Sequence, residues 1–573
     1  MGSFLLKVNK AGVVSGTNDL FIVRPEPVLL LEDDLSELFV WGDPIVDESF
    51  STSFPEHRSA EFLLDNASGH FYFVLLDKRR GQVTAGNSIF SILPVYYHET
   101  ADALFLSDNA IRLGKYCSRT TLSGKFVTEV ILFNFPVSDQ SAIEGVKLLS
   151  SGSYLRIEKG GVKSVRHFSP EELFVSNPVP WKRAIDDAAG SFLASSKKYF
   201  PEEPYFNSFT GGFDGRTLAA AGLFHSRSFT AVCFGSATSG DLLAARHATR
   251  QARIRLEEIS LDDEYVSKAS LDNGREFILN ASGTGSFERA HYLYSAKQLE
   301  NRGSCLVTGN FGSEILRAAH MTGEMISKNL FHLFRGEDAD SAFRSIQESP
   351  EFRSLRLNAI SGAWDEIKEE LRNLPSFSAS YKPFTRNQRF YIFLFNEIFR
   401  KYFGAEMINQ FPLIRNRTPF LDISFLKTLF RSDLAGAYSD FYESNPFKRF
   451  KGQLLYAEII RRAFPALGKT DTDKGYRPDD LLSLPGKIRI GKNHVVKKVI
   501  KPVRDSDPNS VARAWLVNKS FWSSLPHAGD LFNINIPVEN GDNQPDSLLS
   551  RVYTINYLNQ LLHCNEDQGS NPC

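Results

Sequence analysis

The segment Thr210-Gly211-Gly212-Phe213-Asp214-Gly215-Arg216 combines residue types that can hold a phosphate. Two consecutive glycines let the backbone approach a ligand closely and turn its N–H groups toward it. A helix predicted to begin near Arg216 adds its positive N-terminal end, so the segment predicts a site for an anion such as pyrophosphate. Asp214 is a carboxylate beside that anion, which makes sense with a bridging cation such as Mg²⁺. The alternative is a tight strand-to-helix turn in which Asp214 only caps the helix.

This segment is not a Walker A loop, because the glycine spacing differs and no Gly-Lys-Ser/Thr follows. Strand–turn–helix patterns surround it. Apolar runs typical of strands precede residues typical of helices three times, over 205–224, 229–254 and 305–321. Repeated units of this kind predict a doubly wound, parallel α/β sheet.

The regions on either side have other patterns. The first 170 residues contain short aromatic and β-branched runs between polar turns, with a hairpin closed at Gly160-Gly161, and predict an antiparallel domain. Three prolines in 168–180 indicate a linker. Residues from about 340 to 470 have helical spacing, and the remainder is mixed.

The overall composition excludes several classes. The chain has 573 residues, enough for three or four domains, with 66 Lys+Arg against 67 Asp+Glu and a formal charge of −1. With 42% hydrophobic and 23% charged residues, it is neither disordered nor a strongly basic nucleic-acid binder. Five scattered cysteines without a CxxC pair, no signal-peptide pattern and no apolar run long enough for a membrane span predict a cytoplasmic protein.

Several segments, in this order, resemble the ATP pyrophosphatases, and specifically the asparagine synthetase family. The glycine loop is similar to that family's Ser-Gly-Gly-x-Asp-Ser loop, and 228–259 resembles its second strand and following helix, with Val232 at the adenine-contacting backbone position. Thr308–Glu314 resembles the family's Gly-x-Gly-x-Asp-Glu turn, and Arg417–Asp422 its Arg-x-Pro-Phe-Leu-Asp block. Lys474 falls where the family places a phosphate-contacting lysine, with Lys469 as a competing assignment and a surface role as the alternative.

The resemblance implies a two-part α/β fold. Residues 1–170 would form a degenerate Ntn-hydrolase-like αββα glutaminase domain that lacks the N-terminal cysteine. Residues 181–490 would form a doubly wound parallel-sheet synthetase domain with many helices, similar to the adenine nucleotide alpha hydrolases, and 491–573 a mixed C-terminal extension.

Glutamine hydrolysis is expected to be absent. Removal of Met1 would expose Gly2 rather than the nucleophilic cysteine, and Asn87 and Ser88 stand near the family's Arg-Asp pair. The N-terminal domain would then be a retained structural partner, as in the similar beta-lactam synthetases and lasso-peptide cyclases.

The implied activity is ATP-dependent amide ligation with Mg²⁺. A carboxylate of a small molecule or peptide would be activated as an acyl-adenylate, with pyrophosphate and then AMP released, and attacked by ammonia or a substrate amine. A partner protein or a homo-oligomer is possible. The implied catalytic residues are Lys474 and Asp214, and the residues implied to bind ATP or pyrophosphate are Phe209, Thr210, Gly211, Gly212, Phe213, Asp214, Gly215, Arg216, Val232, Thr308 and Gly309.

Two departures favour a rival interpretation, a non-catalytic relative that binds a nucleotide or a partner. Gly215 replaces the loop's last serine and removes one hydroxyl donor. Ser313 replaces the family's second metal-binding aspartate, and a hydroxyl is a weaker Mg²⁺ ligand than a carboxylate. Glu314 is adjacent, but successive helical residues point about 100° apart, so the metal ligands are Asp214 with either Ser313 or Glu314.

Other patterns are weaker. Gly283–Ser286 resembles part of a dinucleotide loop but lacks the third glycine, and a loop beside the substrate is preferred. His247, His291 and His320 lie in expected helices and are interpreted as packing or surface residues. The basic stretch 492–504 is read as a solvated face, with binding of a leader peptide or an anionic surface as the alternative.

Overall fold

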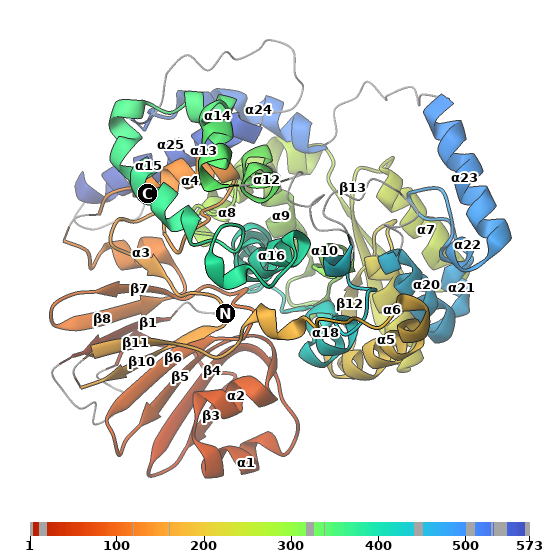
Figure 1. Cartoon of the computed structure of the whole chain (residues 1–573), viewed down its shortest axis with the longest axis horizontal. Coiled ribbons are helices and arrows are strands. Elements are labelled where there is room, and N and C mark those ends of the chain that lie inside the picture. Colours follow the sequence, from red (N-terminus) through yellow and green to blue (C-terminus); the bar gives the residue numbers. More distant parts are fainter. Residues whose placement is uncertain are drawn as a thin grey trace.

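The computed structural model describes residues 4–10, 20–118, 120–159, 161–316, 326–336, 338–439, 451–499, 510–528, 531 and 547–567. It is a mixed α/β structure with two antiparallel sheets, one parallel sheet and many helices (Figure 1). No helix in these residues is both long and apolar enough to cross a membrane.

The N-terminal part consists of two facing antiparallel sheets. One has the order β11-β10-β6-β5-β4-β3 and the other β2-β1-β8-β7-β9. Aromatic side chains from both, including Phe4, Trp41 and Tyr72, form the core between them. Helices α1 (Phe50–His57) and α2 (Ala60–Asn66) pack on the first sheet, and α3 (Ala110–Gly114) packs on the second. The strands are β1 (Leu5–Asn9), β2 (Phe21–Val23), β3 (Leu29–Glu32), β4 (Ser36–Ile45), β5 (Ser68–Asp77), β6 (Gln82–Asn87), β7 (Tyr96–Glu99), β8 (Ala103–Ser107), β9 (Lys147–Leu148), β10 (Ser153–Glu158) and β11 (Gly161–Arg166).

The third sheet is parallel, as the strand–turn–helix units predict. Its order is β14-β13-β12-β15-β16, so the strand order reverses between β12 and β15. In open α/β sheets, ligands bind outside the carboxyl ends of the strands at such a reversal. The strands are β12 (Tyr205–Ser208), β13 (Phe229–Gly235), β14 (Leu256–Ser260), β15 (Leu306–Val307) and β16 (Asn416–Arg417), and the flanking helices include α5 (Trp181–Ser196), α6 (Asp214–Phe224), α7 (Gly240–Ala252) and α9 (Ala290–Leu299).

The remaining helices build a core shared with the N-terminal part. Helix α4 (Gly124–Phe133) packs against α15 and α25, and Arg551 of α25 donates a hydrogen bond to the carbonyl of Ile131 (Figure 1). The C-terminal helices therefore belong to the main core. The other elements are α8 (Ser270–Asn280), α10 (Gly312–Leu316), α12 (Lys328–Arg335), α13 (Ala339–Gln347), α14 (Pro350–Arg353), α15 (Leu357–Arg372), α16 (Arg386–Phe393), the π-helix η7 (Leu394–Phe403), α17 (Gly404–Gln410), α18 (Ile423–Leu429), α20 (Lys451–Ala463), α21 (Pro465–Gly468), α22 (Pro478–Leu482), α23 (Leu484–Val499), α24 (Ser510–Ser524) and α25 (Ser547–Asp567).

The Arg417–Asp422 block joins the parallel sheet to the N-terminal part. The Arg417 guanidinium donates from Nε to Asp43 Oδ2 over 2.6 Å and from a terminal nitrogen to Oδ1 over 3.1 Å. His70 Nε2 lies 2.8 Å from Thr418 Oγ1. Asp422 accepts hydrogen bonds from the backbone N–H groups of Ser424 and Phe425 and so caps α18. The polar side chains of this block therefore hold structure together.

We expect this junction to weaken in acid, because burial lowers the pKa of His70 to about 4, with Asp43 opposing the shift. The unfolded chain then binds more protons than the folded one between about pH 6.5 and 4, so stability is lost as the pH falls through that window. Between pH 7.5 and 5 the His70 contribution should fall by about 2 kcal/mol. Urea unfolding at both pH values should show a smaller pH effect in His70→Gln than in wild type.

The matched control is His247→Gln on α7, whose histidine is exposed. It should keep the wild-type pH dependence. An equal pH effect in wild type and His70→Gln would contradict the prediction.

Candidate functional site

Three segments far apart in the sequence meet at the carboxyl ends of β12 and β15. The N–H of Asp473, between α21 and α22, donates to the carbonyl of Gly211 over 3.1 Å. Lys474 Nζ lies 5.6 Å from the ring centroid of Phe213. The hydroxyl of Ser313, at the start of α10, donates to Asp214 Oδ2 over 2.8 Å. The predicted loop, the Thr308–Glu314 turn and the Lys474 segment therefore form one site (Figure 1).

Asp214 is held from two sides. Ser313 donates to one carboxylate oxygen, and the hydroxyl of Tyr456, which lies on α20, donates to the other. Tyr456 was not predicted from the sequence. It lies in the apolar helical segment LLYAEII and is fully buried, so the sequence around it indicates a core residue.

Glycines around Asp214 make this close packing possible, because they have no side chain. A Cβ on Gly309 would lie 2.6 Å from Asp214 Cβ, and one on Gly312 would lie 2.8 Å from Asp214 Oδ1. A Cβ on Gly215 would lie 2.2 Å from the carbonyl oxygen of Ser208. The backbone at 215 thus has no room for a serine, which gives a physical reason for the first departure from the family's loop.

The loop's amides are already bonded within the chain. The Gly211 N–H donates to Asp241 Oδ1 over 3.2 Å, and the Gly212 N–H donates to Thr210 Oγ1 over 3.3 Å. Asp241 is exposed at the start of α7. Both acceptors are oxygens on side chains that can rotate away, so an incoming phosphate oxygen can replace them.

The remaining loop residues serve mainly as structure. Phe209 and Phe213 are fully buried, so only their backbones face a ligand. Arg216, predicted to contact phosphate, instead donates to the carbonyls of Leu467, Thr470 and Asp471, and burial lowers its pKa to about 10. This guanidinium fixes the loop that carries Lys474 rather than reaching the glycine loop.

Other predicted residues have clear positions. The Val232 carbonyl accepts from the Phe209 N–H over 2.8 Å, which ties β13 to the loop. Thr308 donates from Oγ1 to Asn310 Oδ1 over 2.9 Å, beside Gly309. Of the two residues predicted as the second metal ligand, Ser313 and Glu314, it is Ser313 that bonds to Asp214. The Glu314 charge acts instead on Tyr391, whose pKa is raised by burial and further by Glu314.

The two candidate lysines differ in position. Lys474 is half-buried over Phe213. Lys469 is exposed, and its charge acts on Asp479, where it opposes the rise in pKa that burial causes. The geometry favours Lys474 as the lysine of this site.

The donor set limits how a magnesium ion can bind. Among the described residues, no three His, Cys, Asp or Glu side chains gather as a metal site. Asp214 supplies one carboxylate and Ser313 one hydroxyl. Mg²⁺ commonly binds through one or two carboxylates together with substrate phosphates. The residues therefore fit a cation that arrives with a nucleotide and not a resident metal held by protein alone.

The structure decides some of the weaker sequence predictions, and others concern residues outside the part of the chain that it describes. A Cβ on Gly283 would lie 2.4 Å from Leu558 and one on Gly285 2.7 Å from Phe277, so these glycines allow helix packing and do not form a dinucleotide loop. His291 is packed against Tyr292 at 4.4 Å. Gly2 and His320 lie outside the described residues, as do positions 500–504 of the basic stretch, whose residues 492–499 belong to α23.

At the place of the family's Arg-Asp pair, the side chain of Asn87 makes local hydrogen bonds. Asn87 donates to the Leu93 carbonyl over 2.5 Å and accepts from Ser91 over 3.1 Å, so its amide serves a local turn. A nearby cavity of about 110 Å³ is lined by aromatic side chains, among them Phe4, Trp41 and Tyr72, and also by the charged side chains of Asp108 and Arg112.

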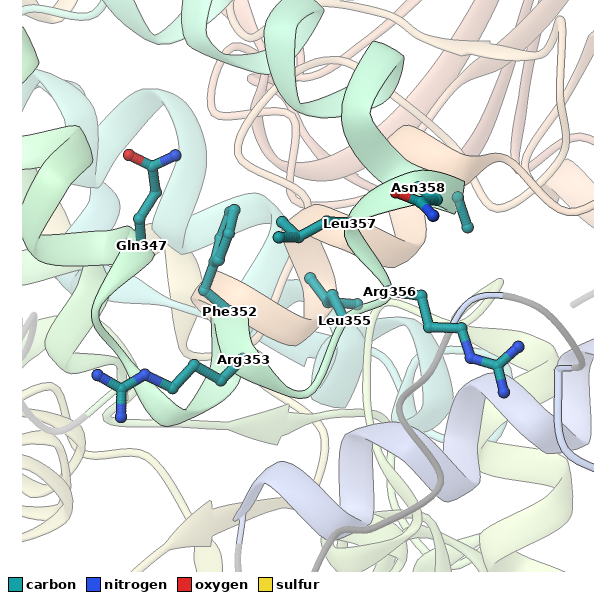
Figure 2. A pocket seen from close by; sticks show the side chains of 8 residues that line it. Gln347, Phe352, Arg353, Leu355, Arg356, Leu357 and Asn358 are labelled. Atoms are coloured by element: carbon teal, nitrogen blue, oxygen red, sulfur yellow. The ribbon is translucent and has the colours of Figure 1, made fainter.

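A hollow of about 930 Å³ lies away from all predicted site residues. Figure 2 shows Arg353 and Arg356 extending in opposite directions from the apolar Phe352, Leu355 and Leu357. It is formed by α13, α14 and the start of α15 and brings no group toward Asp214.

No protein-family model and no curated protein sequence matches the chain. Among solved structures, it is similar to the glutamine phosphoribosylpyrophosphate amidotransferase of B. subtilis complexed with ADP and GMP, at 12% identity over 41% of this chain and 48% of the other, with a TM-score of 0.16. An allosteric regulatory enzyme of purine biosynthesis matches at 11% identity over 40% of this chain and 46% of the other, with a TM-score of 0.17. The chain thus spans about half the length of these structures.

Proposed function

We propose that the chain is an asparagine synthetase-like ligase that uses ATP to activate a carboxylate for amide-bond formation. One observation carries the proposal. The glycine loop with its carboxylate Asp214, the Ser313 hydroxyl and the half-buried Lys474 come from three distant segments and converge where the order of the parallel strands reverses. Parallel sheets bind nucleotides at that position, and the loop suits phosphates because its N–H groups can exchange their side-chain acceptors for phosphate oxygens.

Each group has a role in the proposed reaction. The amides of Gly211 and Gly212 hold the leaving pyrophosphate after Asp241 and Thr210 release them. Lys474 offsets negative charge that develops when the carboxylate attacks the α-phosphate. Binding the carboxylate and nucleotide together supplies part of the acceleration through proximity. Ammonia or an amine then attacks the acyl-adenylate.

Asp214 is the residue that would hold Mg²⁺, with Ser313 and Tyr456 orienting both of its oxygens. When bound, the cation would neutralise phosphate charge. For the N-terminal part we propose an Ntn-like fold without glutaminase activity, since Asn87 stands near the family's Arg-Asp pair and its amide is bonded to the Leu93 carbonyl within a local turn. The nitrogen then comes from free ammonia or from the amine substrate.

A second candidate is a nucleotide- or partner-binding relative without catalysis. The observation that favours it is Ser313, because Asp214 has a hydroxyl beside it where a second carboxylate would hold a metal more firmly. Nucleotide binding and turnover must therefore be measured separately.

Pyrophosphate release from ATP and Mg²⁺ tests the proposal. We expect release by purified protein that depends on one member of a panel of carboxylic acids and amino acids supplied with ammonium. Asp214→Ala should abolish it, because the carboxylate proposed to hold the cation is removed. ATP binding is titrated in parallel by calorimetry.

Binding of Mg-ATP without release under any acid would support the second candidate over the ligase. Absence of any nucleotide binding would refute both.

A further inference from the structure

Helix α23 has one side packed on the protein and one side that faces solvent. Figure 1 shows it as an outlying helix at the right-hand edge of the molecule, beside α22. The packed side carries Gly486, where a Cβ would lie 2.3 Å from the Cα of Asp480, and Ile490, which is 9% exposed. Residues two positions apart in a helix point about 200° apart, so Leu484 and Ile488 lie on the opposite side.

This outer side of α23 is apolar. Leu484 is 74% exposed and Ile488 is 67% exposed, the highest values for large apolar side chains in the part of the chain that the structure describes. The sequence continues the same helical spacing with Val495 and Val499. An amphipathic helix of a globular protein normally turns its apolar stripe toward the core. An apolar stripe on the solvent side therefore indicates a surface that contacts another molecule.

Lysines flank the apolar stripe. Lys487 and Lys492 are exposed, and they follow Leu484 and Ile488 by three and four positions, which makes them neighbours on the helix surface. Helix α23 contains five Lys and Arg residues and no Asp or Glu, although the whole chain has a formal charge of −1. The outer side thus combines apolar contact area with local positive charge.

Two acidic groups beside α23 are paired with an arginine of the same helix. Arg489 lies 3.2 Å from Asp471 Oδ1 and 3.0 Å from Asp480 Oδ2. Asp480 belongs to α22 and is buried, so this pairing takes place where α23 packs on the protein. Arg489 therefore compensates these carboxylates, and the lysines of the outer side keep their charge for an approaching anion.

The shape of this surface favours a lipid bilayer over an acidic peptide. Peptides usually bind in a groove or along the edge of a sheet, whereas α23 is a single outlying helix (Figure 1). A helix with an apolar stripe and flanking lysines can lie in the plane of a membrane surface. Its aliphatic side chains then reach the acyl chains, and its lysines extend to the headgroups.

We propose that α23 docks this protein on the surface of an anionic lipid membrane. Leu484 and Ile488 enter the boundary between headgroups and acyl chains, and Lys487 and Lys492 contact the lipid phosphate and carboxylate groups. The binding is peripheral and needs no helix that spans the bilayer. Because this surface contains none of the residues assigned to the ATP site, the inference stands independently of the proposed ligase activity.

Sedimentation of the full-length protein with lipid vesicles tests the charge requirement. At about 0.1 M NaCl, we expect vesicles of phosphatidylcholine with about 30% phosphatidylserine to bind the protein at least about tenfold more strongly than vesicles of phosphatidylcholine alone. Raising NaCl to about 0.5 M should weaken this binding about tenfold. Equal binding to both vesicles, or no binding at about 5 mM lipid, would overturn the proposal. Binding of polyglutamate without binding of vesicles would overturn it too and would indicate an acidic peptide.

Two double variants place the binding on the outer side of α23. Leu484→Ser combined with Ile488→Ser removes the apolar contact and should weaken binding to the phosphatidylserine vesicles by about tenfold or more. Lys487→Gln combined with Lys492→Gln removes two charges and should also weaken it by about tenfold or more. All four side chains are exposed, so neither variant removes a core contact.

The matched controls change exposed residues of the same types elsewhere. They are Leu243→Ser with Leu357→Ser, and Lys182→Gln with Lys382→Gln, and both should bind vesicles as wild type does. Losses in the α23 variants no larger than in these controls would refute the assignment. Hydrogen exchange of the wild-type protein gives an independent measurement. Vesicles should slow amide exchange in α23 and leave α7 unchanged, and unaltered exchange in α23 would refute the docking.

Discussion

Replacing Lys474 with methionine is expected to slow carboxylate-dependent pyrophosphate release by a factor of about 10²–10³, with a much smaller change in ATP affinity. The side chain is half-buried over Phe213 and belongs to the segment that is hydrogen-bonded to the glycine loop through Asp473 and Gly211. A fixed cation in this position favours the transition state, where phosphate charge is greatest, over the bound nucleotide. Methionine keeps the length and apolar contact of the side chain and removes only the charge.

Single-turnover pyrophosphate release and calorimetric ATP binding together measure this effect. The matched control is Lys469→Met, which removes the same charge from an exposed residue five positions away in the chain. It should retain nearly full activity. Equal losses in the two variants would show that the region's net charge, rather than Lys474, supports turnover, and a loss confined to ATP affinity would make Lys474 a binding residue.

The parallel sheet could be predicted because its signals are local. The strands β12, β13 and β15 are short runs with apolar residues, the turn after each contains glycine or serine, and each helix has its own periodicity, as in 205–224. The order of the strands was not predicted, and neither was the edge strand β16, Asn416–Arg417, which contains no apolar residue. In contrast, the packing of α25 on α4 joins residues more than 400 positions apart. No local sequence pattern predicts such a contact, so from the sequence residues 491–573 were predicted to be a C-terminal extension.

The candidate site could be predicted only where function and backbone geometry require the same residue type. Gly211, Gly212 and Asp214 occur in a loop whose composition already indicates a phosphate site. Arg216 follows the same loop, but its side chain points inward to carbonyls of residues 467–471. The charge of an arginine in a sequence does not show in which direction its side chain points. Tyr456 could not be found, because a tyrosine in an apolar helix is usually a core residue until its hydroxyl partner is known.

The Arg417–Asp422 block contributed much to the family resemblance, yet its polar side chains act at a structural junction. Arg417 binds Asp43, Thr418 contacts His70 and Asp422 caps a helix. A sequence motif therefore indicates that its residues are constrained, but not whether the constraint comes from chemistry or from packing. Removing one partner of the junction distinguishes these two explanations.

Asp43→Ala should lower the free energy of unfolding by about 3–5 kcal/mol, the usual effect of leaving one charge of a buried pair alone. The Asp43 side chain is 4% exposed, and its two oxygens bind two nitrogens of Arg417, which is 16% exposed. After the substitution, the mostly buried guanidinium between β4 and β16 loses the carboxylate that it bonds and keeps only the more distant charge of Glu203. The Asp340→Ala control removes a carboxylate that also pairs with an arginine, Arg372, but is 69% exposed, and should cost less than about 1 kcal/mol. Urea unfolding at pH 7.5 measures the free energy of unfolding of both variants. Similar small losses in the two would mean that this junction tolerates the unpaired arginine. The block would then be constrained by something other than this ion pair.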